Sequence, residues 1–348
     1  KESNQRHVVA NAWGYWIFFA NGSQTPSWTY SATGDPNDWR AGPSPNASVR
    51  DIFEGTGYTG MNAKPSVWYV KATSDVYVAV GDDGTVSNGN RLIHMRKGRL
   101  QSNGDIVWAH SGEVNLSAPC LAAQGNMVAD APVSIAVDTA GFVWINHITA
   151  DNGNIGTTDN LVSYSRSNTA YSVGSSSWTA VPSTGRHLDG IDNCSGNNDG
   201  DDIEAAYINF VVPKMPKSSP VNMVWQAGFN ASEGIANLYS EDDNTASTAE
   251  LGSPGSPLQI DWYPGNTNAG LEGNSNASAV VDSTGNLHIA WIDVNRDIRY
   301  ARFSSTDGLT NVHIASNSAV NFISVSIGLA SSTLLGITTD TIYISMVD

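Results

Sequence analysis

Positive charge is scarce in this chain of 348 residues. The chain has 17 Lys and Arg against 33 Asp and Glu, which gives a formal net charge of −16. Proteins that grip the phosphates of nucleic acid need clusters of Lys and Arg, so the composition argues against nucleic acid as a partner. The acidity itself fits either a repulsive, well-solvated surface or a protein that holds cations.

Long apolar runs are missing as well. No segment approaches the ~20 consecutive apolar residues of a membrane-spanning helix, so no membrane span is predicted. The first residues, Lys1–Gln5, are polar and resemble a mature terminus more than a signal peptide. No segment shows a convincing helical period, and Pro119 and Gly125 interrupt the nearest candidate, Ala118–Val128.

Cysteine is limited to Cys120 and Cys194. The pair could form one disulfide that closes a long loop, or the two thiols could be buried separately. The rest of the composition is typical of an extracellular protein, which favours the disulfide and a secreted or cell-surface location. The 33 Gly and 14 Pro are spread along the chain, and no Pro/Ser-rich linker divides it. We therefore expect a single domain over residues 1–348.

A repeated spelling is the most informative feature that is present. Residues 137–145 and 281–289 both follow Val-Asp-Thr/Ser-x-Gly-x-x-x-Ile. Unrelated hairpins need not share such a spelling, whereas copies of one structural unit solve the same turn and packing problem each time. The pattern around it, such as Asp297–Phe303, alternates polar and apolar residues as a strand does.

Six such units are predicted, with second strands that begin near residues 15, 76, 142, 221, 287 and 333. Their spacing, roughly 45 to 80 residues, leaves room for four strands and variable loops. The last unit is short, with expected strands at Phe322–Ile327, Thr333–Thr338 and Thr341–Met346. The predicted fold is an all-β, six-bladed propeller of four-stranded antiparallel blades, with the N-terminal strand completing the last blade.

Three closing turns carry partial versions of one further motif: Ser31…Asp35…Trp39, Ser102-Asn103-Gly104-Asp105…Trp108 and Ser305–Thr310. They resemble degenerate Asp-boxes of the sialidase-like, BNR-repeat superfamily of six-bladed propellers. The resemblance implies the fold more than an activity, because this architecture hosts hydrolases, lyases, lectins and structural modules.

An enzyme of this superfamily would need a recognisable site. A sialidase converges three arginines on a carboxylate, and the Arg-Ile-Pro-like strand typical of the family is absent. A polysaccharide lyase uses His or Tyr as the base, with Arg or His neutralising the uronate. The candidates for that chemistry are His94, His147, His187, Tyr164 and Arg166. A histidine on a strand is otherwise a packed or solvated residue.

The segment Asp189–Glu204 concentrates carboxylates and glycines, as calcium loops do. The expected ligands are Asp189, Asp192, Asp199, Asp201 and Asp202, and calcium is favoured over a transition metal because the ligands are oxygens. The alternative is a solvated acidic loop tethered through Cys194.

Eleven tryptophans either fill the core between sheets or stack on sugars. Trp39, Trp108 and Trp178 are expected in the core, whereas Trp13, Trp16, Trp28 and Trp262 are less constrained and one or two of them are expected at the surface. Asn-x-Ser sequons, which would carry glycans in a glycosylating host, occur at Asn21, Asn46, Asn115, Asn193, Asn230 and Asn276.

The sequence favours a non-catalytic extracellular or appendage protein that serves adhesion, glycan contact or assembly, with glycans or other copies of itself as partners. The alternative is a carbohydrate-active lyase or hydrolase with its site on the central axis, and a viral surface propeller is a third hypothesis.

Overall fold

The computed structural model describes residues 8–21, 25–40, 49–56, 65–81, 93–114, 126–127, 133–138, 140–150, 160–167, 169–174, 186–187, 209–213, 221–227, 234–241, 258–263, 277–284, 286–292, 298–304, 308–316, 324–334 and 337–347. All regular structure in these ranges is β-strand. They contain no helix long and apolar enough to cross a membrane.

The strands form six antiparallel sheets, here called A to F in chain order. Sheet A consists of β1 (Val8–Asn11), β2 (Gly14–Ala20), β3 (Pro26–Ser31) and β4 (Arg50–Asp51). Sheet B consists of β5 (Ser66–Val70), β6 (Asp75–Gly81), β7 (Ile93–Leu100) and β8 (Ile106–Val114). Sheet C consists of β10 (Ser134–Val137), β11 (Val143–Ala150), β12 (Asn160–Arg166) and β13 (Arg186–His187), with the short β9 (Asn126–Met127) beside β11.

The remaining sheets follow the same order. Sheet D consists of β14 (Asn209–Pro213), β15 (Val221–Ala227), β16 (Gly234–Glu241) and β17 (Leu258–Tyr263). Sheet E consists of β18 (Ala277–Val281), β19 (Leu287–Ile292), β20 (Ile298–Ser304) and β21 (Gly308–Ser316). Sheet F is the hairpin of β22 (Ser324–Leu334) and β23 (Ile337–Val347).

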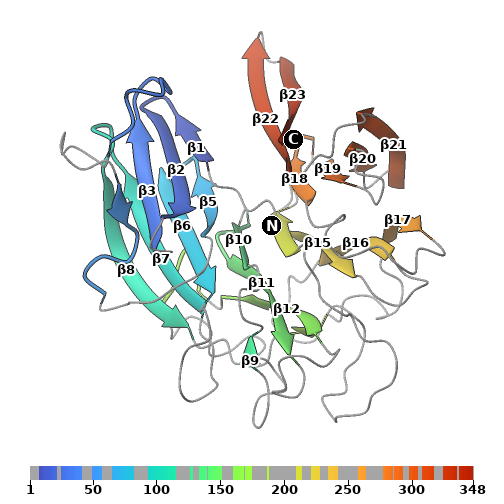
Figure 1. Ribbon diagram of the computed structural model, residues 1–348, viewed down its shortest axis with the longest axis horizontal. Helices are drawn as coiled ribbons and strands as arrows, with labels where there is room; N and C mark the ends of the chain where they lie inside the picture. The colour runs from blue at the N-terminus through green and yellow to red at the C-terminus, as the bar shows by residue number, and fades with distance from the viewer. Residues whose placement is uncertain are drawn as a thin grey trace.

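The first strands of successive sheets meet one another. Strand β10 contacts β5 and β14, and β18 contacts β14 and β22. In Figure 1 the sheets accordingly follow one another in chain order around a common centre, from β1–β4 through β10–β12 to β22–β23. Within each four-stranded sheet, the strands pair in sequence order. The predicted all-β class and antiparallel four-stranded sheets are confirmed by this arrangement.

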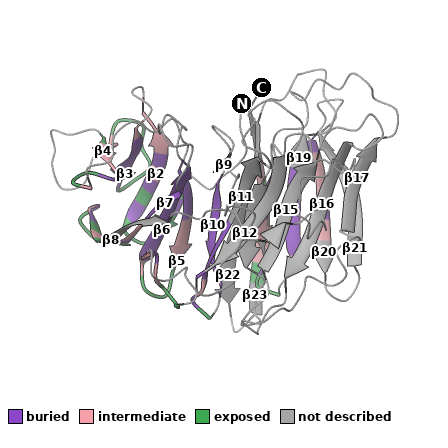
Figure 2. Ribbon diagram, turned by 90° about the horizontal axis from the view of Figure 1, so that it is seen from below, coloured by how far each residue is buried: buried purple, intermediate pink, exposed green. Residues whose placement is uncertain are grey.

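Strand β6 shows why the sequence alternates two kinds of apolar residue. Its valines Val76, Val78 and Val80 lie in one buried cluster with Trp16 and Phe18 of sheet A. Successive side chains of a strand point to opposite faces, so the intervening Tyr77 and Ala79 lie in a second cluster, with sheet C. A strand covered on both faces needs apolar residues at every position. Figure 2 shows this buried region running through β2, β6, β7 and β10.

Two glycines let hairpin turns approach tyrosine rings. Gly104 has φ +89° and Gly141 has φ +90°, conformations that a residue with a Cβ rarely adopts. A Cβ at Gly104 would lie 2.3 Å from the Tyr30 ring, and a Cβ at Gly141 would lie 2.3 Å from the Tyr171 ring. Both positions therefore require glycine for backbone and packing reasons at once.

The second strands predicted to begin near residues 15, 76, 142, 221 and 287 are confirmed, because β2, β6, β11, β15 and β19 each begin within one residue of these positions. The strand predicted at Thr333–Thr338 is wrong. Its first residues end β22 and its last begin β23, so the segment spans the hairpin connection. The Ser and Thr content hid this turn, because it carries no Asn-Gly or Asp-Gly signal.

The predicted completion of the last sheet by the first strand is also not seen. Strand β1 pairs with β2 inside sheet A, and sheet F contains only β22 and β23 in the described part of the chain.

Candidate functional site

The repeated sequence motif forms the same turn in sheets C and E. The backbone amides of Ala140 and Phe142 each donate to Asp138 Oδ1, at 2.9 Å in both cases. In the same way Thr284 and Asn286 donate to Asp282 Oδ1, again at 2.9 Å. An aspartate that accepts from amides two and four residues ahead fixes the chain reversal. The conserved spelling of the two segments therefore reflects a shared turn.

An aromatic ring six residues after each aspartate completes the motif. Trp144 Nε1 donates to Asp138 Oδ2 at 2.9 Å, and His288 Nε2 lies 3.0 Å from Asp282 Oδ2. Each carboxylate thus accepts from the turn with one oxygen and from a buried ring with the other. We call these two arrangements the sheet C clamp (Asp138, Trp144) and the sheet E clamp (Asp282, His288).

The sheet E clamp continues to a third residue. His288 Nδ1 lies 2.6 Å from the hydroxyl of Tyr300. Asp282 is an ionised acceptor, so His288 Nε2 carries a proton, and in the neutral imidazole Nδ1 accepts from the Tyr300 hydroxyl. The phenol proton is therefore directed at a group that can take it. An indole has no such lone pair, so Trp144 cannot play this part in sheet C.

The pKa shifts of Asp282 and Tyr300 fit a hydrogen-bond chain that runs from Tyr300 through His288 to Asp282. Burial alone would raise the pKa of Asp282, but the hydrogen bonds from His288, Thr284 and Asn286 outweigh it and hold that pKa far below its usual range. Burial raises the pKa of Tyr300, with Arg302 opposing the rise. These directions give an ionised carboxylate at Asp282 and a neutral phenol at Tyr300.

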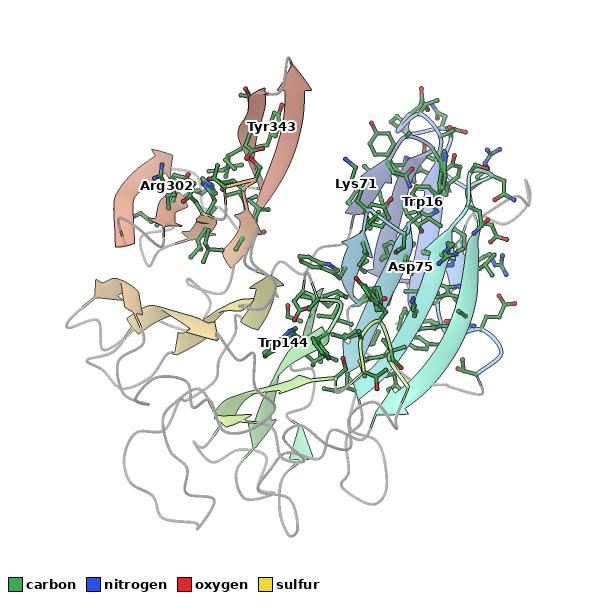
Figure 3. The ribbon with its side chains drawn as sticks, turned by 180° about the vertical axis from the view of Figure 1, so that it is seen from behind. Trp16, Lys71, Asp75, Trp144, Arg302 and Tyr343 are labelled. Carbon is green, nitrogen blue, oxygen red and sulfur yellow. The ribbon has the colours of Figure 1, made fainter. Side chains whose placement is uncertain are left out.

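The clamp is also joined to the neighbouring sheet. Ser283 donates from its backbone N at 2.7 Å and from Oγ at 2.6 Å to Asp340 Oδ2 of β23. Tyr300 and Ala290 pack with Ile327 and other apolar residues of sheet F. The sheet E clamp therefore lies at the E–F interface, and Figure 3 shows Arg302 on sheet E and Tyr343 on the sheet F hairpin.

Two predicted lyase residues occupy repeat positions. In register, Arg166 pairs with Trp144 as Arg302 pairs with His288. Tyr164 likewise pairs with Asn146, as Tyr300 pairs with Ala290. Tyr164 and Arg166 are therefore the sheet C counterparts of Tyr300 and Arg302. The Tyr-x-Arg spelling belongs to the repeat and does not by itself mark a catalytic centre.

The predicted histidines are distributed over two sheets. His147 and His187 both pair with Ser163, so the register sets them in one row across β11, β12 and β13. His147 is next to Asn146, the partner of Tyr164, and so it takes a position on the opposite face of the sheet from Tyr164. His94 is on β7 of sheet B. The structure therefore places His94 on a different sheet from the other four candidates.

His94 has the environment of a core residue. It is 2% exposed, and the Phe53 ring meets it edge-on with the centroids 6.3 Å apart. Burial lowers the pKa of His94 to about 4, so the imidazole is neutral at neutral pH.

Several predicted sites lie outside the described residues. These are the proposed calcium ligands Asp189, Asp192, Asp199, Asp201 and Asp202, the cysteines Cys120 and Cys194, and five of the six sequons: Asn46, Asn115, Asn193, Asn230 and Asn276. Within the described ranges, no group of three or more His, Cys, Asp or Glu side chains is placed to hold a metal ion. The sixth sequon residue, Asn21, accepts from Thr25 N and donates to Ser27 Oγ, each at 3.1 Å.

A second candidate region is the end of sheet A where two turns meet. The β1–β2 turn exposes Trp13, which is 39% accessible, whereas Trp16 and Trp28 are fully buried. Asn11 Oδ1 accepts from Trp13 N at 2.7 Å, and the Tyr30 hydroxyl donates to Trp13 O at 2.5 Å. The indole thus projects from a backbone that is fixed from two sides, which confirms the expectation of an exposed tryptophan in this group.

The second turn, residues 31–38, lies directly against the first. A Cβ on Gly14 would meet Ser31 O at 2.4 Å, and a Cβ on Gly34 would meet the Tyr15 ring at 3.4 Å. Asp38 Oδ2 accepts from Ala32 N and Thr33 Oγ1, which outweighs desolvation and lowers the pKa of Asp38. We call Trp13 together with the exposed residues Thr33, Asp35 and Asn37 the aromatic tip.

The sheet E clamp was missed by sequence reasoning, which chose Tyr164 and Arg166 instead of Tyr300 and Arg302. A signal was present, because aligning the two repeats sets His288 against Trp144 six residues after the aspartate. That exchange replaces a ring that only donates by one that can also accept.

No protein-family profile matches the chain, and no curated protein matches it in sequence. Solved structures match it in fold. A mutant of AofleA from Arthrobotrys oligospora has a TM-score of 0.53 at 10% identity, over 98% of this chain and 84% of that one. The Hadza microbial sialidase Hz136 has a TM-score of 0.51 at 9% identity, over 94% of this chain and 60% of that one.

A lectin from Aleuria aurantia in complex with Fucα1-6GlcNAc has a TM-score of 0.45 at 11% identity, over 90% of this chain and 79% of that one. The sialidase and the AofleA mutant are the two of these three with TM-scores above 0.5. Identities this low relate the folds and leave the activity to be argued from this chain's own residues.

Proposed function

We propose that this protein is a non-catalytic, extracellular, six-bladed propeller that contacts glycans through the aromatic tip of sheet A. The observation that carries the proposal is the exposed Trp13 indole on a turn that packs against a second turn, which bears the exposed residues Thr33, Asp35 and Asn37. Flat apolar rings stack on the C–H faces of sugars, and neighbouring amide and carboxylate groups hydrogen-bond to hydroxyls.

The rigidity of the tip supports this role. Both turns are closed by side-chain hydrogen bonds, from Asn11 in the first and from Ser31 and Asp38 in the second. Close contacts at Gly14 and Gly34 lock the turns to each other. A site that is ordered before binding loses little conformational entropy when a sugar arrives, which helps a small contact to be specific.

Glycan binding measured on wild type and Trp13→Ala tests the proposal. A glycan array on the full chain first identifies a ligand, and isothermal titration then gives its Kd. We expect Trp13→Ala to weaken binding by about tenfold, equivalent to about 1.4 kcal/mol. Val107→Ala, which alters a similarly exposed apolar residue on sheet B, should leave Kd unchanged. Equal affinities for wild type and Trp13→Ala would refute this site.

One observation favours an enzyme as the second candidate. The Tyr300 hydroxyl is within hydrogen-bond distance of His288, and His288 of Asp282. This order suits a reaction in which His288 acts as the general base and takes the proton of the Tyr300 phenol. Under this alternative, the protein depolymerises an acidic or neutral polysaccharide, and Tyr300→Phe abolishes turnover while leaving the fold intact. A polysaccharide panel assayed for reducing ends and for unsaturated products separates the two candidates.

A further inference from the structure

The turn between β7 and β8 carries an Asn-Gly pair, Asn103-Gly104. Asparagine before glycine is prone to deamidation, because the glycine amide nitrogen can attack the asparagine carboxamide and glycine has no side chain to hinder the approach. Asn103 is exposed, so water reaches its carboxamide. The dipeptide alone therefore marks Asn103 as a site of spontaneous modification.

The turn holds both of the groups that would react. Gly104 N, the nucleophile, donates to Gln101 O at 3.0 Å, and Asp105 N donates to Asn103 Oδ1 at 3.0 Å. The Gly104 nitrogen must lose its proton and approach Asn103 Cγ before a bond can form, and its hydrogen bond to Gln101 retains that proton. The bond from Asp105 fixes the orientation of the carboxamide. The closed turn thus opposes the reaction at both ends.

The turn is also attached to sheet A. Trp16 Nε1 donates to Gly104 O at 3.1 Å, and a Cβ on Gly104 would lie 2.3 Å from the Tyr30 ring. Arg50 of β4 forms an ion pair with Asp105 at 3.1 Å. Gly104 itself is buried. A movement of the Gly104 nitrogen toward Asn103 therefore requires the turn to separate from sheet A.

We infer that sheet A protects Asn103 from deamidation, and that Asn103 reacts only when this turn opens. In the open turn, Gly104 N attacks Asn103 Cγ, and its proton passes through solvent to Nδ2, which leaves as ammonia. The product is a five-membered succinimide. Water then opens this ring at either carbonyl, which gives aspartate or isoaspartate at position 103. The reaction needs no reagent other than water.

The isoaspartate product does not fit back into its place. It routes the backbone through the former side chain, which lengthens the chain by one methylene directly before Gly104. The Tyr30 ring leaves no room for Gly104 to shift, and the Gly104 carbonyl must still reach Trp16 Nε1. Modification therefore makes a transient opening between sheets A and B permanent. Tyr30 also donates to Trp13 O, so one of the contacts that hold the aromatic tip is weakened. The inference does not depend on glycan binding.

Peptide mapping by mass spectrometry measures the protection directly. The full chain is kept in mildly alkaline buffer with and without denaturing urea, and deamidation at Asn103 is followed over time. We expect the native protein to react at least about tenfold more slowly than the unfolded chain, because opening must precede attack. Equal rates in the two states would overturn the inference.

Matched tryptophan substitutions test which contact protects the turn. Trp16→Phe removes the donor to Gly104 O and should speed native-state deamidation about fivefold. The control is Trp28→Phe, because Trp28 is fully buried in the same cluster and its Nε1 has no hydrogen-bond partner among the described residues. Equal acceleration by the two variants would refute protection through Trp16. The wild-type comparison stands even if a substitution prevents folding.

Thermal denaturation tests the effect of the isoaspartate. Wild type and Asn103→Ser are aged together in urea, returned to native buffer and compared with fresh samples. Serine cannot form the succinimide, and its hydroxyl can still accept from Asp105 N. Ageing should lower the Tm of wild type by about 2 °C more than that of Asn103→Ser. Equal losses would show that the modified turn docks again, and would contradict the inference.

Discussion

The clamps of sheets C and E share one plan and differ in a single ring. In both, an aspartate accepts two turn amides with one oxygen and a buried ring N–H with the other. The ring is an indole in sheet C and an imidazole in sheet E. The indole ends the hydrogen-bond chain, whereas the imidazole extends it to Tyr300. One exchange at a repeat position thus turns a purely structural contact into a group that can transfer a proton.

The comparison also shows which groups of the clamp the shared turn needs and which it does not need. Both copies keep the aspartate and a ring donor, because a buried carboxylate without donors is costly. The acceptor atom of His288 is not needed for the turn, since Trp144 manages without one. Any role of Tyr300 beyond packing therefore depends on this one atom.

Removing the aspartates should have the largest effect and tests whether the two clamps are equivalent. Asp138→Ala and Asp282→Ala each leave a buried ring N–H and two turn amides without their acceptor. We expect each to lower the free energy of unfolding by about 3 kcal/mol in urea denaturation. Ser283→Ala, within the same turn, is the milder control. A loss under about 1 kcal/mol in one sheet alone would show that its clamp is dispensable.

His94 is buried against the Phe53 ring, whereas His288 is hydrogen-bonded to Asp282. The pKa of His94 is lowered from 6.5 to about 4 by burial, so the unfolded chain binds a proton between these values that the folded protein does not. Stability should therefore fall by up to about 3 kcal/mol as the pH drops from 6.5 toward 4. Urea denaturation across this range, on wild type and His94→Gln, measures the effect. An unchanged pH slope in His94→Gln would contradict it.

Replacing each ring by phenylalanine compares the clamps directly. Phenylalanine cannot donate, so Trp144→Phe should lower the free energy of unfolding by about 2 kcal/mol. His288→Phe should lower it by about 3 kcal/mol, because the Tyr300 hydroxyl also loses its partner. Chemical denaturation of the two variants gives both values, and equal losses would mean that the His288–Tyr300 bond contributes nothing.

Tyr300→Phe should have the smallest effect, about 1 kcal/mol, since only one hydroxyl is removed. In a His288→Phe background, the same change should be nearly neutral, because its partner is already gone. The double-mutant cycle isolates the bond from the packing of the Tyr300 ring. If the two losses are additive, the His288–Tyr300 bond contributes nothing to the free energy of unfolding, and Tyr300 stabilises the protein through the packing of its ring alone.

The sequence predicted the strands well because their two faces are both buried. In β6 the positions after Asp75, and in β10 all positions, are apolar, aromatic or small, and Gly or Asp residues follow both strands in the sequence. It failed at Thr333–Thr338, where the connection holds the single glycine Gly336 and no Asn-Gly or Asp-Gly pair. The packing between sheets could not be predicted from the sequence either, because the A–B core brings together residues far apart in the chain, such as Trp16 and Val76.

The candidate site was predictable only in part. His94 has no sequence feature that separates a core imidazole from a catalytic one, since burial by Phe53 is a tertiary property. Tyr164 and Arg166 were chosen by residue type, and their equivalence to Tyr300 and Arg302 appears only in the strand register. The bond from His288 to Tyr300 depends on two adjacent strands being in one register, which the repeat spelling does not encode.

The two glycines that pack against tyrosine rings limit how two of the hairpin turns can change. At Gly104 and Gly141, even a methyl group would strike Tyr30 or Tyr171. Homologues of this chain should therefore hold these two hairpin tips constant in length and residue. Insertions, tags and circular breakpoints at these two tips should therefore be tolerated poorly.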